Sequence, residues 1–306
     1  MPQTLLMNSL ISSIQIGSMY ALMALGITLT MSVIKLPNFA HAEYVTVGAF
    51  TALIVSMNLS SNPLIIMGSA FVVGAIISLL SHQIVFKSLE KQNASFYTLL
   101  LASFAVGLII RYILFMIADQ FSLFDKRIQI PLEIVFRSET VIITNIFLWV
   151  VPTSIICVGI LTILLKYTPL GREMRALANN ITLAQIIGIA VERVKNNTWL
   201  LVGGLAGLAG ALWGMNTSVS PLMGWTAILS VFAAAILGGL SSFPGTIMGA
   251  YVVSFSENML MQYLNFHYDV DFSFKAAIPF IIIIGVLLIR PQGFTEFFTH
   301  ARGLKR

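Results

Sequence analysis

The chain has 306 residues, of which 58% are hydrophobic and only 9% are charged, and its formal net charge is +5. Soluble domains carry about one quarter charged residues, so this chain could not cover its apolar side chains with charge in water and needs lipid as its solvent. The single cysteine, Cys157, excludes a disulfide within the chain and a cysteine-based metal site. The positive charges gather at the ends of apolar runs, which favours membrane orientation over binding of nucleic acid.

Nine apolar stretches have about the length that a helix needs to cross a bilayer: 7–33, 40–58, 63–86, 95–117, 141–165, 199–216, 223–241, 245–264 and 274–290. The second and the seventh are short or rich in small and polar residues, so they could be broken or re-entrant. The sequence therefore predicts an all-α integral membrane protein. It would be a polytopic bundle of about eight or nine transmembrane helices, forming a single domain over residues 1–306.

The distribution of Lys and Arg predicts the orientation of these helices. The connectors at 87–93 and 166–198 and the tail from Arg290 onward are rich in basic residues, which places them in the cytoplasm. Lys35 is then also inside and the amino terminus is outside. The loop at 118–140 is extracytoplasmic in this arrangement, although it contains three basic residues, which four acidic ones partly balance.

Pairs of glycines four residues apart predict where helices touch. Without a side chain, the backbones of two helices can approach closely and gain dispersion contacts. Tight packing within the bundle or between subunits is the simpler interpretation, and a hinge that moves in transport is the alternative. The pairs are Gly203 with Gly207, Gly210 with Gly214, and Gly245 with Gly249.

The connector at 166–198 is the longest polar break in the chain and is predicted to contain two short helices. Thr168 can cap the first helix, with Pro169 at its first position, and Asn179 and Asn180 can end it.

Thr182 is predicted to begin the second helix, with Gln185 completing a capping box, and Gly188 can end it. The first helix is two-sided: Met174, Leu177, Ala178 and Ile181 share one side, and Arg172, Arg175 and Asn179 share another. From the residues alone, the pair could rest on lipid headgroups or dock into a partner protein.

The connector resembles the cytoplasmic loop of the permease subunits of ATP-binding-cassette importers for branched-chain amino acids. The residues that match the family's pattern are Gly171-Arg172, Arg175-Ala176, Asn179, Ala184, Gly188-Ile189 and Arg193. Further resemblances follow in the family's order at 24–43, 203–214, 232–251 and 290–294, where the sequence reads RPQGF. The histidine-containing turn and the length are similar to the LivH-type subunit rather than its LivM-type sister.

Some positions depart from the family's pattern, and these departures bear on the identity of the substrate more than on membership of the family. Ala42, Ser32 and Ser241 stand where glycine is usual, and Pro37 precedes Asn38. Relatives of this family carry urea, short amides or other small solutes, so these remain alternatives to branched-chain amino acids.

The resemblance implies a multi-pass permease of the prokaryotic cell membrane, which forms a translocation path and has no chemistry of its own. Two cytoplasmic ATPase subunits would bind ATP and Mg, and the matched connector residues would couple them to this chain. A sister LivM-like permease and an extracytoplasmic solute-binding protein would complete the transporter. The chain itself has no GxxxxGK[ST] phosphate loop, so neither a cofactor nor a metal is expected in it.

Ionisable residues inside predicted spans are candidates for function, because each costs about 2.5–3.5 kcal/mol to insert. Asn38, His41 and Glu43 lie at the cytoplasmic end of the first span, where Pro37 breaks the helix at Lys35-Leu36. His41 and Glu43 are two residues apart and would face away from each other on a helix. They could form an inner gate or serve only as scaffold.

Three further polar positions have alternative interpretations. Glu257 could line the path or form a hydrogen bond between helices. Arg111 is expected to extend its side chain to the outer membrane surface. His267, Asp269 and Asp271 resemble a weak metal cluster, but a solvated loop is the favoured interpretation.

Other classes of protein fit the sequence less well. An ion-coupled secondary transporter could use Glu43 or Glu257 as its proton carrier, but it would leave the two-helix connector without a role. A channel would leak its solute without ATP, which a flux assay would reveal. An intramembrane enzyme is disfavoured, because the chain contains neither HExxH nor a GxSG segment.

Overall fold

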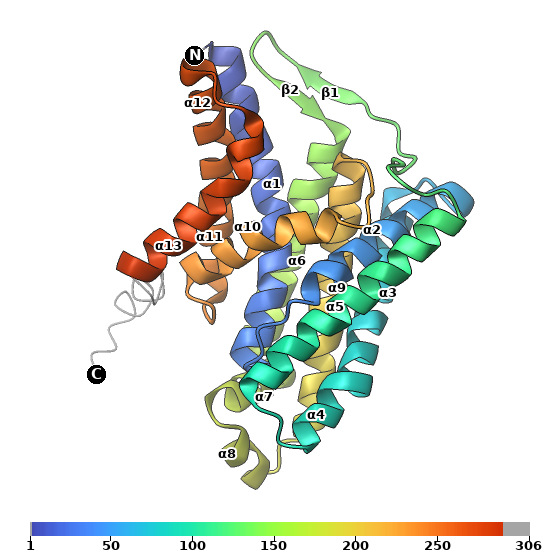
Figure 1. Cartoon of the computed structure of the whole chain (residues 1–306), viewed down its shortest axis with the longest axis vertical. Helices are drawn as coiled ribbons and strands as arrows, with labels where there is room; N and C mark the ends of the chain where they lie inside the picture. Colours follow the sequence, from blue (N-terminus) through green and yellow to red (C-terminus); the bar gives the residue numbers. More distant parts are fainter. Residues whose placement is uncertain (1, 290–306) are drawn as a thin grey trace. The chain divides into compact units, whose positions relative to one another are not determined.

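The computed structural model describes residues 2–289, and this part of the chain is mainly helical (Figure 1). The resembling segment RPQGF at 290–294 and the basic tail therefore lie outside the described residues. The predicted spans correspond to α1 (Gln3–Leu29), α2 (His41–Asn58), α3 (Pro63–Ser81), α5 (Phe96–Gln120), α6 (Asn145–Tyr167), α9 (Val191–Asn216), α10 (Met223–Gly238), α11 (Phe243–Phe255) with α12 (Met261–Tyr268), and α13 (Ala277–Ile289). Shorter elements are α4 (Lys87–Lys91), α7 (Pro169–Asn179), α8 (Ile181–Ile186) and the 3-10 turn η4 (Phe272–Ala276).

Between residues 2 and 289, six helices are long and apolar enough to cross a membrane: Gln3–Ile34, Pro63–Lys91, Phe96–Gln120, Asn145–Tyr167, Val191–Asn216 and Phe272–Ile289. Helix α10 is a shorter apolar helix. The prediction of a helical membrane protein is confirmed. The expected number of eight or nine spans is only approximate, because six helices meet the length and hydropathy needed to cross a membrane and the other apolar helices are shorter.

Three long helices contain a π-helical segment in the described part of the chain. They are η1 (Thr30–Ile34) after α1, η2 (His82–Phe86) after α3, and η3 (Ser256–Leu260) between α11 and α12. In each segment the backbone bonds run from residue i to i+5, so the helix continues with a widened turn. Each widened turn carries a buried polar side chain: Ser32 in η1, His82 in η2 and Glu257 in η3.

The loop predicted at 118–140 ends in a β-hairpin. Strand β1 (Ile134–Arg137) pairs antiparallel with β2 (Ile142–Thr144), and Ser138 N–H donates to the Val141 carbonyl across the turn. The following helix begins at Asn145, four residues after the approximate start predicted at 141. The β-branched residues in both strands favour extended backbone, which explains the difference.

Close contacts divide the chain into two compact units. One unit contains residues 29–130 and 156–228, and α2, α3 and α9 form its core. Their backbones touch at glycines: a methyl group on Gly207 would overlap the Ala70 carbonyl, one on Gly203 would overlap Gly74, and one on Gly48 would overlap Gly207. Small residues thus allow the three helices to pack directly, backbone to backbone.

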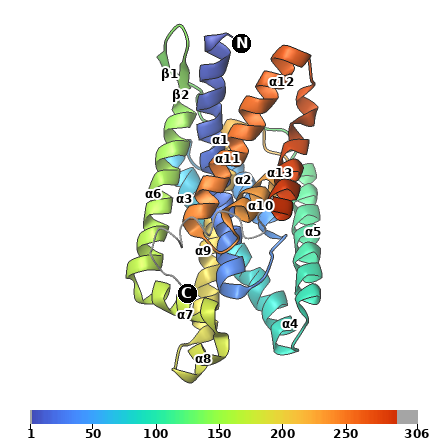
Figure 2. The same cartoon turned by 90° about the vertical axis from the view of Figure 1, so that its left-hand side faces the viewer.

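The other unit contains residues 2–28, 131–155 and 229–289. In it α1 packs along α11, and the polar contacts between them include Ser18 with the Tyr251 hydroxyl at 3.0 Å and Thr28 with Thr246 at 2.7 Å (Figure 2). Gly249 lies against the Ala234 carbonyl of α10, and a side chain there would overlap it. Hydroxyl pairs and a glycine contact therefore join these helices.

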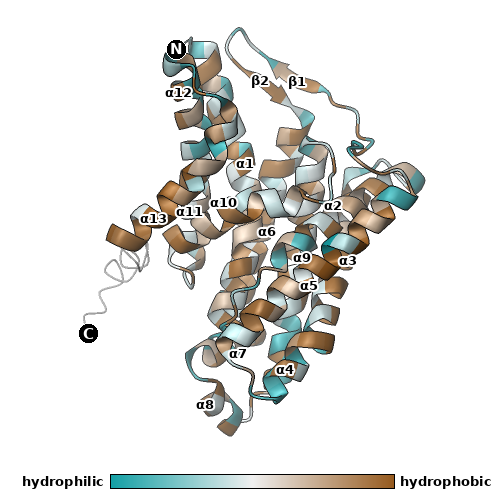
Figure 3. Ribbon diagram, viewed as in Figure 1, coloured by the Kyte–Doolittle hydropathy of each residue, from teal (hydrophilic) through white to brown (hydrophobic). Residues whose placement is uncertain are grey.

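Exposed apolar side chains cover several helices in this structure. Helix α13 is strongly hydrophobic along its length (Figure 3), and Ile281, Leu288 and Ile289 are 68%, 79% and 80% exposed. Such a surface would be costly in water and is ordinary in contact with hydrocarbon. The surface agrees with the membrane location that the composition predicts.

Candidate functional site

The turn between η1 and α2 has the broken backbone that the sequence predicts. Lys35 adopts a left-handed conformation with φ of 62° and ends η1. The Ser103 hydroxyl of α5 accepts a hydrogen bond from Phe39 N–H at 3.2 Å. The helix break leaves backbone N–H groups without a partner in the helix, and a side chain of a neighbouring helix accepts from one of them. Inside a membrane such groups need a partner within the protein.

Glu43 stands in the first turn of α2 and is fully buried, and Arg111 of α5 neutralises it. Arg111 Nε donates to Glu43 Oε1 at 3.0 Å, and a terminal guanidinium nitrogen contacts the same oxygen. The guanidinium also lies 4.4 Å from the ring centroid of Trp225. The prediction that Arg111 extends to the membrane surface is wrong, because a carboxylate and an aromatic face are available where it lies.

His41 and Asn38 are also fully buried but do not join this ion pair. The His41 ring lies edge-on to the Tyr44 ring, with centroids 6.4 Å apart. Tyr44 is fully buried as well. The turn therefore holds polar groups of two kinds: an ion pair toward α5 and, apart from it, the neutral side chains of Asn38, His41 and Tyr44.

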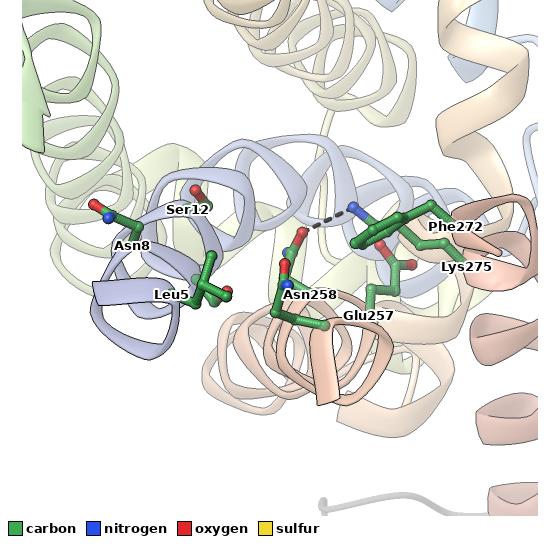
Figure 4. A pocket seen from close by; sticks show the side chains of 9 residues that line it. Leu5, Asn8, Ser12, Glu257, Asn258, Phe272 and Lys275 are labelled. Carbon is green, nitrogen blue, oxygen red and sulfur yellow. Dashed lines mark hydrogen bonds between the residues drawn. The ribbon is translucent and has the colours of Figure 1, made fainter. Parts of the chain in front are cut away.

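Glu257 belongs to the other unit, where it stands in η3 and is 2% exposed. The Tyr20 hydroxyl of α1 donates to its Oε2 at 2.8 Å, and the Ser230 hydroxyl of α10 donates to Oε1. The carboxylate thus joins three helices by hydrogen bonds. The neighbouring Asn258 accepts from Lys275 Nζ at 2.8 Å, beside a cavity in the same unit (Figure 4).

The caps of the connector helices agree with the sequence in all but one respect. The Thr168 side chain accepts from Gly171 N–H, with Pro169 at the start of α7. The second helix begins earlier than Thr182, because Asn180 is extended and its side chain accepts from Leu183 N–H. The predicted cap at Thr182 is therefore wrong, and Asn180 serves as both the end of α7 and the cap of α8.

The two sides of α7 differ as predicted. Met174 and Leu177 are buried, and Arg172 is exposed. Arg175 is also exposed, but its guanidinium donates to the Leu165 carbonyl at the end of α6. The same α6–α7 corner explains Gly171, since a side chain there would overlap the backbone of residues 164–165.

The end of the connector combines a glycine turn with exposed apolar groups. Gly188 has φ of +84°, a conformation that favours glycine. Ala184 is buried, whereas Ile186 and Ile187 are 76% and 65% exposed, and Arg193 is exposed on α9. This exposed apolar end is available for contact with lipid or protein.

Two ion pairs at the start of α9 escaped the sequence analysis. Lys87 Nζ lies 2.7 Å from Glu192, and Lys195 Nζ lies 2.6 Å from Glu90. They join α4 to α9 beside the buried Trp199, which stacks on His82 and Phe86. The sequence did contain a signal for these two ion pairs. Lys87 precedes Glu90 by three positions, whereas Glu192 precedes Lys195 by three, so each helix presents one acidic and one basic residue on the same face in opposite order.

The remaining packing glycines are also placed by the structure. A side chain on Gly210 would overlap the Val45 carbonyl, and one on Gly245 would overlap Gly238. Gly214 lies against Ile128 and Val219 with more room. Over residues 2–289, no group of three His, Cys, Asp or Glu side chains could hold a metal ion. The loop that contains His267 lies within this range.

The multi-helix membrane fold, the buried polar groups within it and the two-helix connector define a polytopic membrane permease. A family model described as the permease component of the branched-chain amino acid transport system matches residues 9–287. The chain belongs to this family, which confirms the resemblance found in the sequence and the multi-pass membrane location.

Individual relatives agree with this family. The chain is 32% identical over 286 residues to the probable branched-chain amino acid transport permease protein LivH of Methanocaldococcus jannaschii, covering 91% of this chain and 89% of the relative. It is 27% identical over 310 residues to the high-affinity branched-chain amino acid transport system permease protein LivH of Escherichia coli, covering 94% of both chains. It is 26% identical over 277 residues to the ribose import permease protein RbsC of Escherichia coli, covering 85% of this chain and 79% of the relative.

A solved structure has a similar fold. PsaBC from Streptococcus pneumoniae in complex with Fab matches with a TM-score of 0.50 and 15% sequence identity, covering 96% of this chain and 95% of that chain. At this identity the likeness concerns the fold alone.

Proposed function

We propose that the chain is a permease subunit of an ATP-binding-cassette importer and forms the translocation path for branched-chain or related small amino acids. Membership of the permease family and the printed roles of the relatives from Methanocaldococcus jannaschii and Escherichia coli support this function. The observation that carries it is the connector, whose exposed apolar end has no role in a transporter that works alone.

The partners follow from the same proposal. Two cytoplasmic ATPase subunits bind ATP and Mg and hydrolyse the nucleotide, since this chain has no phosphate-binding loop. An extracytoplasmic solute-binding protein delivers the amino acid, and a LivM-like sister permease pairs with this chain. The permease itself is not an enzyme and holds no cofactor.

The connector is the docking surface for the ATPase subunits in this proposal. Leu183, Ile186 and Ile187 provide the apolar contact, which is the usual core of a protein interface, and Arg172 lies exposed on α7 as a polar neighbour. Arg175 holds α7 against α6 through the Leu165 carbonyl, so its role is to position the connector.

At the turn before α2, the buried ion pair supports a scaffold role for Glu43. His41 and Asn38 remain candidates for an inner gate, on the neutral side of the turn. Loss of uptake with intact assembly in a His41→Ala variant would support the gate, and loss of assembly would support scaffold.

Docking is tested by pull-down of the ATPase subunits and by uptake into proteoliposomes. A Leu183→Ser, Ile186→Ser variant should insert normally but lose both the ATPase subunits and ATP-driven uptake. The matched control is Leu132→Ser, since Leu132 is 64% exposed in the loop at 118–140. Unchanged association and uptake after replacement of residues 170–188 by a flexible linker would refute the docking role.

The substrate class is tested in the same vesicles with the complete transporter. ATP-dependent uptake of labelled leucine should be inhibited by isoleucine and valine, but not by urea, acetamide or ribose. Inhibition by urea or acetamide but not by isoleucine and valine would instead assign urea or short amides as the substrate class. Uptake that needs an ion gradient and no ATP would refute the ATP-driven mechanism.

A further inference from the structure

The unit that contains residues 2–28, 131–155 and 229–289 holds a cavity of about 210 Å³ (Figure 4). Ligand sites for drug-sized molecules enclose roughly 300–1,000 Å³, so this cavity suits a smaller solute. Its walls come from the first turns of α1, from η3 and α12, and from η4. The lining residues are Leu5, Asn8, Ser9, Ser12, Glu257, Asn258, Gln262, Phe272 and Lys275.

The cavity wall carries one acidic and one basic side chain. Glu257 is almost fully buried, and the hydroxyls of Tyr20 and Ser230 hold it in place. Lys275 donates to Asn258 Oδ1 at 2.8 Å, which occupies one of the three donors of an ammonium group. Charges of both signs at one small cavity are complementary to a ligand that itself carries both.

The remaining lining side chains are of two other kinds. Ser9 and Ser12 of α1 supply hydroxyl groups that can donate and accept hydrogen bonds, whereas the Asn8 amide already donates to the Thr4 carbonyl and accepts from Ile142 N–H. Leu5 and Phe272 are apolar. Figure 4 shows Leu5 of α1 on the side of Asn258, with Phe272 and Lys275 beyond it, whereas Asn8 points away from this group. The cavity therefore offers polar groups for a charged head and apolar surface for a hydrocarbon side chain.

We infer that this cavity binds an apolar α-amino acid, with the ligand carboxylate at Lys275 and its ammonium group at Glu257 and the α1 side chains. The inference rests on the proposed function and deepens it, because it assigns a substrate site to the permease chain itself. In the proposed orientation the cavity lies at the extracytoplasmic end of α1. An amino acid released by the binding protein would meet it first.

The site is tested by calorimetric titration of the complete transporter in nanodiscs, without the solute-binding protein. L-leucine should bind, whereas 4-methylpentanoate and 3-methylbutylamine, which each lack one charged group, should bind at least tenfold more weakly. The variant Lys275→Met should weaken leucine binding about tenfold to a hundredfold, as expected for loss of a charge-assisted hydrogen bond.

Two further variants keep the test independent of folding. Lys126→Met removes an exposed lysine from the loop at 118–140 and should leave leucine binding unchanged. Ser12→Ala changes an exposed cavity residue and should weaken binding, with an unaltered elution profile in size-exclusion chromatography. Unchanged leucine affinity in both Lys275→Met and Ser12→Ala would overturn the inference, as would equal binding of leucine and its two singly charged analogues.

Failure of the site and failure of the proposed function give different results. ATP-dependent leucine uptake by the wild-type transporter, combined with no effect of Lys275→Met on leucine binding, would refute the site alone. Leucine binding that Lys275→Met abolishes, in a transporter that imports no branched-chain amino acid, would support the site and refute the proposed function.

Discussion

The buried ion pair between Glu43 and Arg111 gives a prediction that can be worked out in detail. The perturbation is removal of either charge alone, by Glu43→Gln or Arg111→Met, compared with removal of both. Each single change leaves the other charge buried without its partner, because the Glu43 side chain is 0% and the Arg111 side chain 11% exposed. The double change leaves two neutral side chains in the same space.

The magnitude follows from the distance between the charges. At 3.0 Å and an effective dielectric constant of about 20, their Coulomb attraction is roughly 5.5 kcal/mol, which the desolvation of both groups largely offsets. Removal of one partner of a buried pair costs about 3–5 kcal/mol, whereas neutral replacement of both is often close to neutral. The double variant should therefore be more stable than either single variant.

The assay is a double-mutant cycle on detergent-purified protein, with unfolding followed by denaturant or by heat. Arg137→Met is the control, since Arg137 is an exposed arginine on β1, and it should change the free energy of unfolding by less than about 0.5 kcal/mol. Single variants that each lose under about 1 kcal/mol, with a double variant that is no more stable, would refute the reasoning.

Three other changes test separate parts of the structure. Gly207→Leu should prevent α9 from packing on α3, because even a methyl group there would overlap the Ala70 carbonyl, whereas Gly68→Leu, which meets open space, should leave purification yield and thermal stability unchanged. Thr168→Ala should lower helix content at the connector and destabilise α7 by about 1 kcal/mol, and equal amide hydrogen exchange in both proteins would contradict the cap. Hydrogen bonds from Ser273 hold the pKa of Asp271 below its ordinary value, so this carboxylate favours the folded loop above the ordinary aspartate pKa and loses that effect as pH falls through its lowered value. Ser273→Ala should raise the pKa of Asp271 in a carbon-detected NMR titration, and an unchanged titration curve would contradict the assignment.

Much of the fold could be predicted from the sequence, because apolar runs and helix-capping residues depend on residues that are close together in the chain. Apolar runs located the long helices to within a few residues at most ends. The first connector helix was predicted with its cap, because Thr168 and Pro169 are adjacent and have strong positional preferences. Asn180 and Thr182 compete to cap the next helix, and position alone does not decide between two good caps.

The candidate sites were less predictable because their contacts join residues far apart in the chain. Arg111 pairs with a carboxylate 68 positions away, so its sequence neighbours suggested an arginine that reaches for the membrane surface. Glu257 was identified as a buried polar group, but its partner Tyr20 is 237 positions away. The strand β2 adjoins the apolar run of α6 without a polar break, so its residues resemble the start of that helix in the sequence.

The π-helical segment at 256–260 has a consequence for how the family can vary in length. A widened turn of this kind holds one residue more than an ordinary helical turn, and a helix advances about 100° per residue. Deletion of one residue there would turn the widened turn into an ordinary one, so Gln262 and the rest of α12 would keep their orientation instead of rotating by that angle. Relatives that are one residue shorter in this segment should therefore still present the same side chains of α12 to the cavity.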